Sequence, residues 1–163
     1  MRLSVCGMLV FVALTLSTPA FCLSPKWEQC QDVNNEATAD RSLAACNRIL
    51  NDHRETPNYA MALRNRCGIQ YTKGNYDCAL ADCNQALTME PRSAIGLNRR
   101  GLIFYMRQDN ERAITDFNAA LRLDPNMANA LDNRGLAEQA KGDTEAGDAD
   151  IARAKKINPD IGQ

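Results

Sequence analysis

From residue 60 to residue 161 the apolar positions recur with a helical period, in pairs of segments that are each about as long as a helix. A short polar turn such as KGNY or KGDT separates the two segments of a pair. Each pair ends at a proline, which stops the second helix. These prolines belong to an evenly spaced series, whose period is typical of stacked helix–turn–helix repeats: Pro57, Pro91, Pro125 and Pro159.

The three segment pairs also share small residues at fixed places, and on these they resemble tetratricopeptide repeats. The resemblance implies an all-α fold, a right-handed solenoid of about four helix–turn–helix hairpins, with full units at 60–93, 94–127 and 128–161. Large side chains do not fit where helices approach closely, so small residues are expected at the eighth, twentieth and twenty-seventh positions of each unit, counted from its first residue. They are Cys67, Gly101 and Gly135; Ala79, Ala113 and Gly147; Ala86, Ala120 and Ala154.

A fourth, less regular unit precedes these three. The octet LAACNRIL at 43–50 returns as LADCNQAL at 80–87, which aligns Cys46 with Cys83. The alignment predicts a degenerate first unit over residues 23–59, with three extra residues near NDHRET. Its first helix contains DVNNEATAD, whose Asn and Asp side chains compete for backbone hydrogen bonds, so we expect it to be short or frayed.

The N-terminal residues 1–22 have the pattern of a secretory signal peptide. Arg2 is followed by an apolar stretch and then by small residues, and cleavage after Ala20 or after Cys22 fits the pattern. The alternative is an uncleaved segment that anchors the N-terminus in a membrane, because the uncharged stretch is long enough to span one. Cleavage predicts an exported protein, periplasmic or secreted and without a membrane span, of a kind typical of bacteria.

Composition and charge exclude several function classes. The formal net charge is −1, which gives no electrostatic footprint for nucleic acid. His53 is the only histidine, it lies in a polar loop, and there is no Cys-x-x-Cys pair or phosphate-binding glycine loop. We therefore expect no metal, no cofactor and no catalytic site, and a protein that is not an enzyme.

The cysteines form pairs at equivalent positions of their units. The spacing from Cys30 to Cys46 equals that from Cys67 to Cys83, and the other units have no cysteine at these positions. In an oxidising compartment this pattern favours the disulfides Cys30–Cys46 and Cys67–Cys83, each joining the two helices of one hairpin. Reduced core cysteines and other pairings such as Cys46–Cys67 remain alternatives. Cys78 is a free thiol, part of an intermolecular bridge, or the partner of Cys22 if cleavage retains Cys22, and none of these is preferred.

The resemblance also implies a concave face, lined by the first helices, that binds a peptide or a helix. An apolar and aromatic stripe with a few polar groups suits such a partner. A clamp for a terminal carboxylate is disfavoured, because only Asn65 and Arg99 match the five positions that it needs. The residues expected to line the face are Trp27, Met61, Arg64, Tyr71, Ile95, Asn98, Leu102, Tyr105, Met106, Asp132 and Leu136.

Two functions follow from this organisation. The first is a non-enzymatic protein–protein interaction module that binds a protein or peptide partner in its concave face after export. The second is a structural or assembly subunit that self-associates when its end repeats stack on another copy, since an array of repeats needs polar ends to stay separate.

Overall fold

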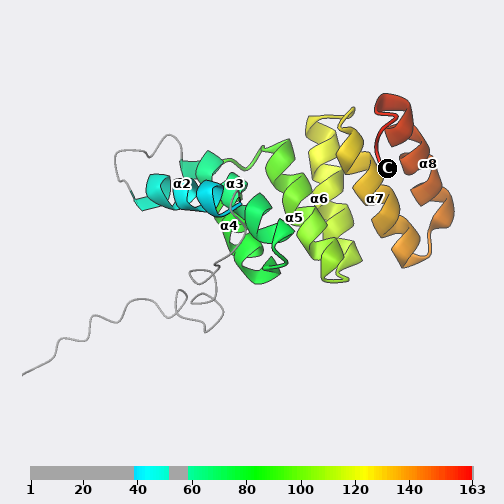
Figure 1. The fold of residues 1–163 in the computed structure, drawn as a ribbon. Coiled ribbons are helices and arrows are strands. Elements are labelled where there is room, and N and C mark those ends of the chain that lie inside the picture. Colours follow the sequence, from blue (N-terminus) through cyan, green and yellow to red (C-terminus); the bar gives the residue numbers. More distant parts are fainter. Residues whose placement is uncertain (1–38, 52–58, 163) are drawn as a thin grey trace, which may run out of the picture.

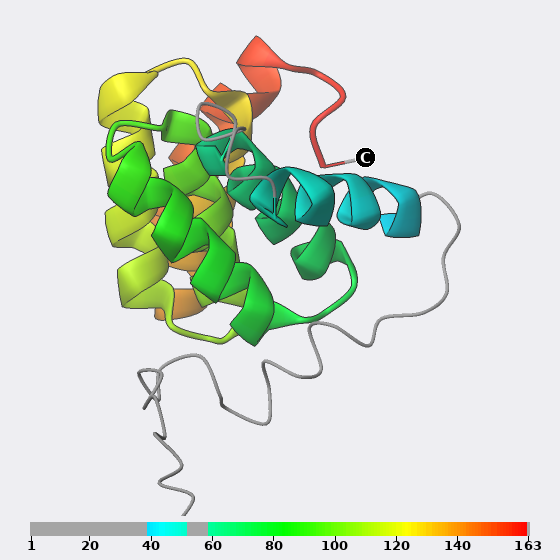
Figure 2. The same cartoon turned by 90° about the vertical axis from the view of Figure 1, so that its left-hand side faces the viewer.

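The computed structural model describes residues 39–51 and 59–162, which contain seven α-helices and no strand. The helices follow one another in a row from α2 at one end to α8 at the other (Figure 1). Figure 2 views the row from its α2 end, with the later helices behind. The helices are α2 (Ala39–Asn51), α3 (Tyr59–Thr72), α4 (Tyr76–Met89), α5 (Ala94–Met106), α6 (Asn110–Leu123), α7 (Ala128–Lys141) and α8 (Thr144–Ile157).

The helices pair into hairpins in the order that the sequence predicts. The pairs α3–α4, α5–α6 and α7–α8 make the most extensive contacts, and each hairpin then packs on the next through α4–α5 and α6–α7. Helix α2 packs against α3. The all-α fold class and the hairpin solenoid are therefore confirmed.

Polar caps explain where several helices begin. The side chains of Ser93, Asp109 and Asp143 accept hydrogen bonds from backbone N–H groups three residues later, at the start of α5, α6 and α8. The second helices α4 and α6 end at Met89 and Leu123, two residues before Pro91 and Pro125, because proline cannot continue the helix.

The turn inside each hairpin needs one residue with a left-handed backbone. Gly74 and Gly142 fill this position with φ values of +75° and +99°, and glycine adopts them without steric cost. The hairpin α5–α6 has Gln108 instead, at φ +61°. Gln108 is the one residue other than glycine with positive φ among the described residues.

Small residues at the eighth position allow the two helices of a hairpin to touch. A Cβ atom added at Gly101 would lie 2.7 Å from Cε1 of Phe117, whose side chain is fully buried. A Cβ atom at Gly135 would lie 2.7 Å from the backbone oxygen of Gly147. The predicted close approach is thus present in both hairpins, where Phe117 and Ile151 fill the space beside the glycines.

The hairpin α3–α4 uses a disulfide at the same two positions. Cys67 and Cys83 are bonded, with their Cα atoms 5.5 Å apart, and both residues are completely buried. This prediction is confirmed. Because the bond closes a loop of 16 residues, it stabilises the fold by about 3 kcal/mol in the chain-entropy model.

The predicted bond between Cys30 and Cys46 is wrong, because Cys46 is a free, buried thiol. Cys46 lies on α2, and it borders a cavity that residues of α3 and α5 also line. Burial raises the pKa of the Cys46 thiol, although the charge of Arg66 opposes this shift. Cys78 is disulfide-bonded, which removes the free thiol from the alternatives for that residue.

Several sequence predictions lie outside the described residues. They include the signal peptide at 1–22, the first helix of the degenerate unit 23–59, and the side chains of Trp27, Cys30 and His53. Among the helices that the structure describes, none is both long and apolar enough to cross a membrane.

Candidate functional site

A groove crosses the first helices of three successive hairpins, α3, α5 and α7. Its cavity measures about 370 Å³. Apolar contacts come from Tyr71 and Leu102, and most of the other lining residues are polar. The lining residues are Gly68, Tyr71, Thr72, Asn98, Arg99, Leu102, Asn129, Asp132 and Asn133.

A second cavity of about 500 Å³ adjoins the first on the side of α2. The two share Gly68, Thr72 and Arg99, and together we call them the central groove. The second cavity is more apolar, because α2 and α3 contribute aliphatic side chains to its wall. Its lining residues are Cys46, Ile49, Met61, Ala62, Asn65, Gly68, Ile69, Thr72 and Arg99.

Arg99 lies where the two cavities meet. Its Nη1 donates a hydrogen bond to the backbone oxygen of Arg64 at 2.6 Å. Gly68 makes room for the guanidinium group, since a Cβ atom at Gly68 would lie 3.3 Å from Cζ of Arg99. The hydrogen bond and the space beside Gly68 together hold the guanidinium group of Arg99 against α3.

The charge of Arg99 is not balanced by an acidic group in the described part of the chain, where no carboxylate pairs with it. Burial lowers the pKa of Arg99, and the positive charge of Arg64 acts in the same direction. A guanidinium group nevertheless stays protonated in proteins. Arg99 therefore presents a partly desolvated positive charge to the central groove.

Asn98 and Asn133 join α5 to α7 at the floor of the groove. Asn133 Nδ2 donates a hydrogen bond to Asn98 Oδ1 at 3.1 Å, and Asn98 is buried. Buried amides with one such bond retain further donors and acceptors. Asp132 also lines this cavity, so the central groove contains a carboxylate as well as the guanidinium group of Arg99.

The structure brings together part of the predicted groove. Met61, Tyr71, Asn98, Leu102 and Asp132 line the two cavities. The other predicted residues do not line these two cavities. Arg64 is paired with Glu90 at 3.1 Å, and Tyr105 packs on the cluster around Phe104. Ile95, Met106 and Leu136 are exposed, and Trp27 lies outside the described residues.

The most important groove residue that sequence reasoning did not place there is Arg99. It belongs to a series, Asn65, Arg99 and Asn133, that recurs once in each repeat and lines the groove along its length. In the sequence, Asn65 and Arg99 were matched only to an incomplete carboxylate clamp. Their shared position in successive repeats was the signal that could have shown all three to be one polar stripe.

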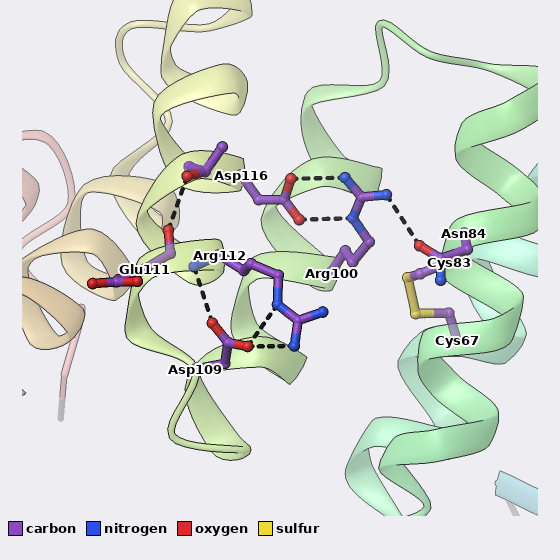
Figure 3. Close-up of polar contacts among 9 residues, drawn as sticks. Cys67, Cys83, Asn84, Arg100, Asp109, Glu111, Arg112 and Asp116 are labelled. Atoms are coloured by element: carbon purple, nitrogen blue, oxygen red, sulfur yellow. Dashed lines mark hydrogen bonds and ion pairs between the residues drawn. A yellow bond between two sulfur atoms is a disulfide. The ribbon is translucent and has the colours of Figure 1, made fainter.

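A second recurring set holds the hairpins together on the other side of the first helices. In each hairpin an arginine of the first helix forms a two-bond ion pair with an aspartate of the second, and it also contacts an asparagine of the preceding hairpin. Figure 3 shows Arg100 between Asp116 and Asn84, close to the Cys67–Cys83 bond. The three sets are Arg66–Asp82–Asn47, Arg100–Asp116–Asn84 and Arg134–Asp150–Asn118.

Burial and charge act in opposite directions on these pairs. Burial raises the pKa of Asp82, while the hydrogen bond and the charge of Arg66 lower it. The hydrogen bond to Asp116 raises the pKa of Arg100 despite its burial. The pairs are therefore structural: they satisfy one another and leave no reactive group. No group of residues suited to a metal ion is found among those described.

A family model for tetratricopeptide repeats matches residues 69–128 and 99–160, which together make up more than half of the chain. The chain belongs to the tetratricopeptide repeat (TPR) family. TPR domains are typically non-enzymatic protein–protein interaction modules. No curated protein is significantly similar to the chain in sequence.

Solved structures of TPR domains share the fold. The first TPR domain of human RPAP3 is 22% identical, with a TM-score of 0.61, over 65% of this chain and 84% of that one. The Arabidopsis OM64 TPR domain is 17% identical, with a TM-score of 0.62, over 64% and 87%. A Thermobaculum terrenum O-GlcNAc transferase is 24% identical, with a TM-score of 0.61, over 63% of this chain but only 20% of its own.

Proposed function

We propose that the protein is a non-enzymatic interaction module that binds an extended peptide segment of a partner protein in the central groove. The observation that carries this proposal is the position of Arg99, a partly buried cation without a carboxylate partner among the described residues, between two joined cavities. A group of this kind gains more from an anionic ligand than an exposed arginine does, because its charge is already partly desolvated.

The shape of the groove suggests how such a segment would lie. An acidic side chain or a terminal carboxylate would reach Arg99, where a guanidinium can form two parallel hydrogen bonds with a carboxylate. Apolar side chains of the segment would pack against Ile49, Met61 and Ile69 on the α2 side. Backbone amides of the segment would find partners in Asn65 and Asn133, at the two ends of the groove.

Two similar structures support a peptide partner. The first TPR domain of Spaghetti (RPAP3), 21% identical to this chain with a TM-score of 0.60, is described as bound to an HSP90 peptide with the sequence SRMEEVD. The second TPR domain of the same protein, 20% identical with a TM-score of 0.59, is described with the same peptide. The identity of the partner of this chain is a separate question, since likeness at this level extends to the fold alone.

Selection from a library of extended peptides tests the proposal. We expect the purified protein to select sequences in which an acidic residue is flanked by apolar residues. The variant Arg99→Gln should weaken binding of the selected peptides at least about tenfold, because a hydrogen bond to a charged group contributes about 1.5–3 kcal/mol. Arg92→Gln removes an equal charge from an exposed loop residue and should leave binding unchanged.

Failure to select any sequence would contradict a peptide-binding groove. Equal affinities of the wild-type protein and the Arg99→Gln variant would show that the peptide binds elsewhere.

We further propose that the protein acts after export, in the periplasm or outside the cell. The pattern of residues 1–22 and the Cys67–Cys83 disulfide support this proposal, because such bonds persist in oxidising compartments. Mass spectrometry of the N-terminus of protein taken from its native compartment tests it. A start at residue 21 or 23 is expected, whereas an intact N-terminus in a membrane fraction would mean that the segment remains as an anchor.

A further inference from the structure

A third cavity, of about 290 Å³, lies away from the central groove, between the second helices α6 and α8 and bordered by α7. It shares no lining residue with the central groove. Three of its lining residues are arginines and none is acidic. The lining residues are Asn118, Leu121, Arg122, Pro125, Arg134 and Arg153, and we call this cavity the arginine pocket.

Only one of the three arginines is neutralised by the described part of the protein. Arg134 forms two hydrogen bonds with Asp150, at 2.6 and 2.8 Å. Arg153 Nη2 donates to the backbone oxygen of Pro125 at 2.8 Å, which holds the guanidinium group at the edge of the pocket without balancing its charge. Within the described part of the chain no carboxylate pairs with Arg122 or Arg153. Arg122 and Arg153 are both exposed residues, and they bring two unpaired positive charges to one small cavity.

The preceding junction between hairpins provides an internal comparison. The residues at the equivalent positions one repeat earlier keep the asparagine, leucine, proline and paired arginine, but have Thr88 and Ala119 in place of Arg122 and Arg153. The four retained residues pack and bond the hairpins together in both places. Stacking of the hairpins thus requires neither Arg122 nor Arg153.

We propose that the arginine pocket binds a phosphate group. Two uncompensated guanidinium groups match a dianion, and the three acceptor oxygens of a phosphate allow both to form paired hydrogen bonds. A single carboxylate would balance one of the two charges and leave the other without a partner. The bond between Arg153 and Pro125 reduces the entropy that this side chain loses when the ligand binds.

Titration with inorganic phosphate at neutral pH and constant ionic strength tests the proposal, using the arginine side-chain N–H signals in NMR spectra. We expect saturable shifts at Arg122 and Arg153. The variants Arg122→Thr and Arg153→Ala, which copy the preceding junction, should each weaken binding at least about tenfold. The double variant should show no saturable binding. Arg92→Thr removes the same charge from an exposed loop and should bind as the wild type does.

The variants are expected to retain the thermal midpoint of the wild type, since Thr88 and Ala119 occupy these positions in a folded junction. Shifts that grow linearly without saturation would overturn the proposal. So would an equal loss of affinity in Arg92→Thr, because it would reduce the effect to general surface charge.

Flotation with vesicles distinguishes the two sources of phosphate. If vesicles containing phosphatidic acid, whose headgroup is a phosphate monoester with three terminal oxygens, retain the wild type, while the double variant and phosphatidylcholine vesicles give no binding, the ligand is a lipid headgroup. If the wild type binds inorganic phosphate saturably and does not float with either vesicle, the ligand is a free phosphate. Either result supports a phosphate site, and absence of both kinds of binding contradicts it.

Discussion

At Gly101 the backbone of α5 touches the ring of Phe117, which the surrounding helices bury completely. The same two positions contain Gly135 with Ile151 in the last hairpin and a disulfide in α3–α4. In each hairpin one residue of the first helix and one of the second therefore pack together at this point. The identity of one partner limits the size of the other, because a packed interior has no spare volume.

The variant Gly101→Ala should lower the free energy of unfolding by about 1–3 kcal/mol, the usual cost of overpacking. Urea unfolding measures this cost. Gly68→Ala is the matched control, because its new Cβ atom would meet only the movable guanidinium end of Arg99. The control should be as stable as the wild type or slightly more stable, since alanine favours a helix. Equal stability of Gly101→Ala and the control would show that the ring of Phe117 can move away.

Gln108 adopts a left-handed backbone that the other two hairpins assign to glycine. A residue with a Cβ atom loses roughly 1–2 kcal/mol in this conformation, while glycine loses more chain entropy on folding. We expect Gln108→Gly to raise the free energy of unfolding by about 0.5–1 kcal/mol. Gly142→Ala should lower it by a similar amount, without any clash, because no atom lies within 4 Å of the added Cβ. Thermal unfolding of both variants checks the opposite signs.

At the scale of the helices, ion pairs between arginine and aspartate connect three elements at once. Arg66 of α3 bonds to Asp82 of α4 through two contacts of 2.7 Å, and to Asn47 of α2 at 2.7 Å. Asp82 is almost fully buried. A carboxylate in such a place depends on its cation, since an unpaired buried charge is strongly destabilising.

The variant Arg66→Met should lose about 3 kcal/mol of stability at neutral pH. Burial already raises the pKa of Asp82, and loss of Arg66 removes the opposing effect, so the folded variant holds the proton more tightly than the unfolded chain. The unfolding free energy of the variant should therefore fall as pH rises above the unfolded value of about 3.9, and recover on acidification.

Urea unfolding across this pH range tests the expectation. Arg107→Met is the control, because the Arg107–Asp77 pair is exposed on both sides and such pairs contribute less than about 1 kcal/mol. The control should show neither the large loss nor the recovery at low pH. If Arg66→Met followed the pH dependence of the control, the carboxylate of Asp82 would not depend on Arg66 for its stabilisation.

At the scale of the whole molecule, the last helix presents a polar outer face. In α4 and α6 two leucine or isoleucine residues pack on the first helix of the following hairpin. In α8 the equivalent positions are charged and exposed. Leu80 and Ile114 correspond to Asp148, and Leu87 and Leu121 correspond to Lys155. This face does not favour stacking on another copy, and so speaks against an assembly subunit built through α8.

We expect no concentration-dependent association through α8 in the wild-type protein. The double variant Asp148→Leu/Lys155→Leu restores the apolar pattern of the inner helices and should form dimers at high concentration. Light scattering coupled to size-exclusion chromatography measures both. Wild-type oligomers that dissociate when Asp148 and Lys155 are exchanged for other polar residues would return support to end-to-end stacking.

The sequence by itself determined the repeat period, the places where the hairpins turn and where their second helices stop, and the positions of close contact. These features depend on local rules: proline ends a helix, glycine fits a left-handed turn, and large side chains do not fit between touching backbones. The bond between Cys67 and Cys83 followed in the same way, because both residues belong to one hairpin. A pattern that returns from repeat to repeat makes each such rule visible more than once.

Only the tertiary structure decided how groups from different hairpins meet. The cation of Arg99, the hydrogen bond from each paired arginine to an asparagine of the preceding helix, and the two free charges of the arginine pocket depend on neighbours from separate hairpins. The bond predicted for Cys46 was wrong; its thiol is free, and it borders a cavity that residues of α3 and α5 also line. Local periodicity specifies which face a residue occupies, but the partner that it meets there, or lacks, is determined by the stacking of whole hairpins.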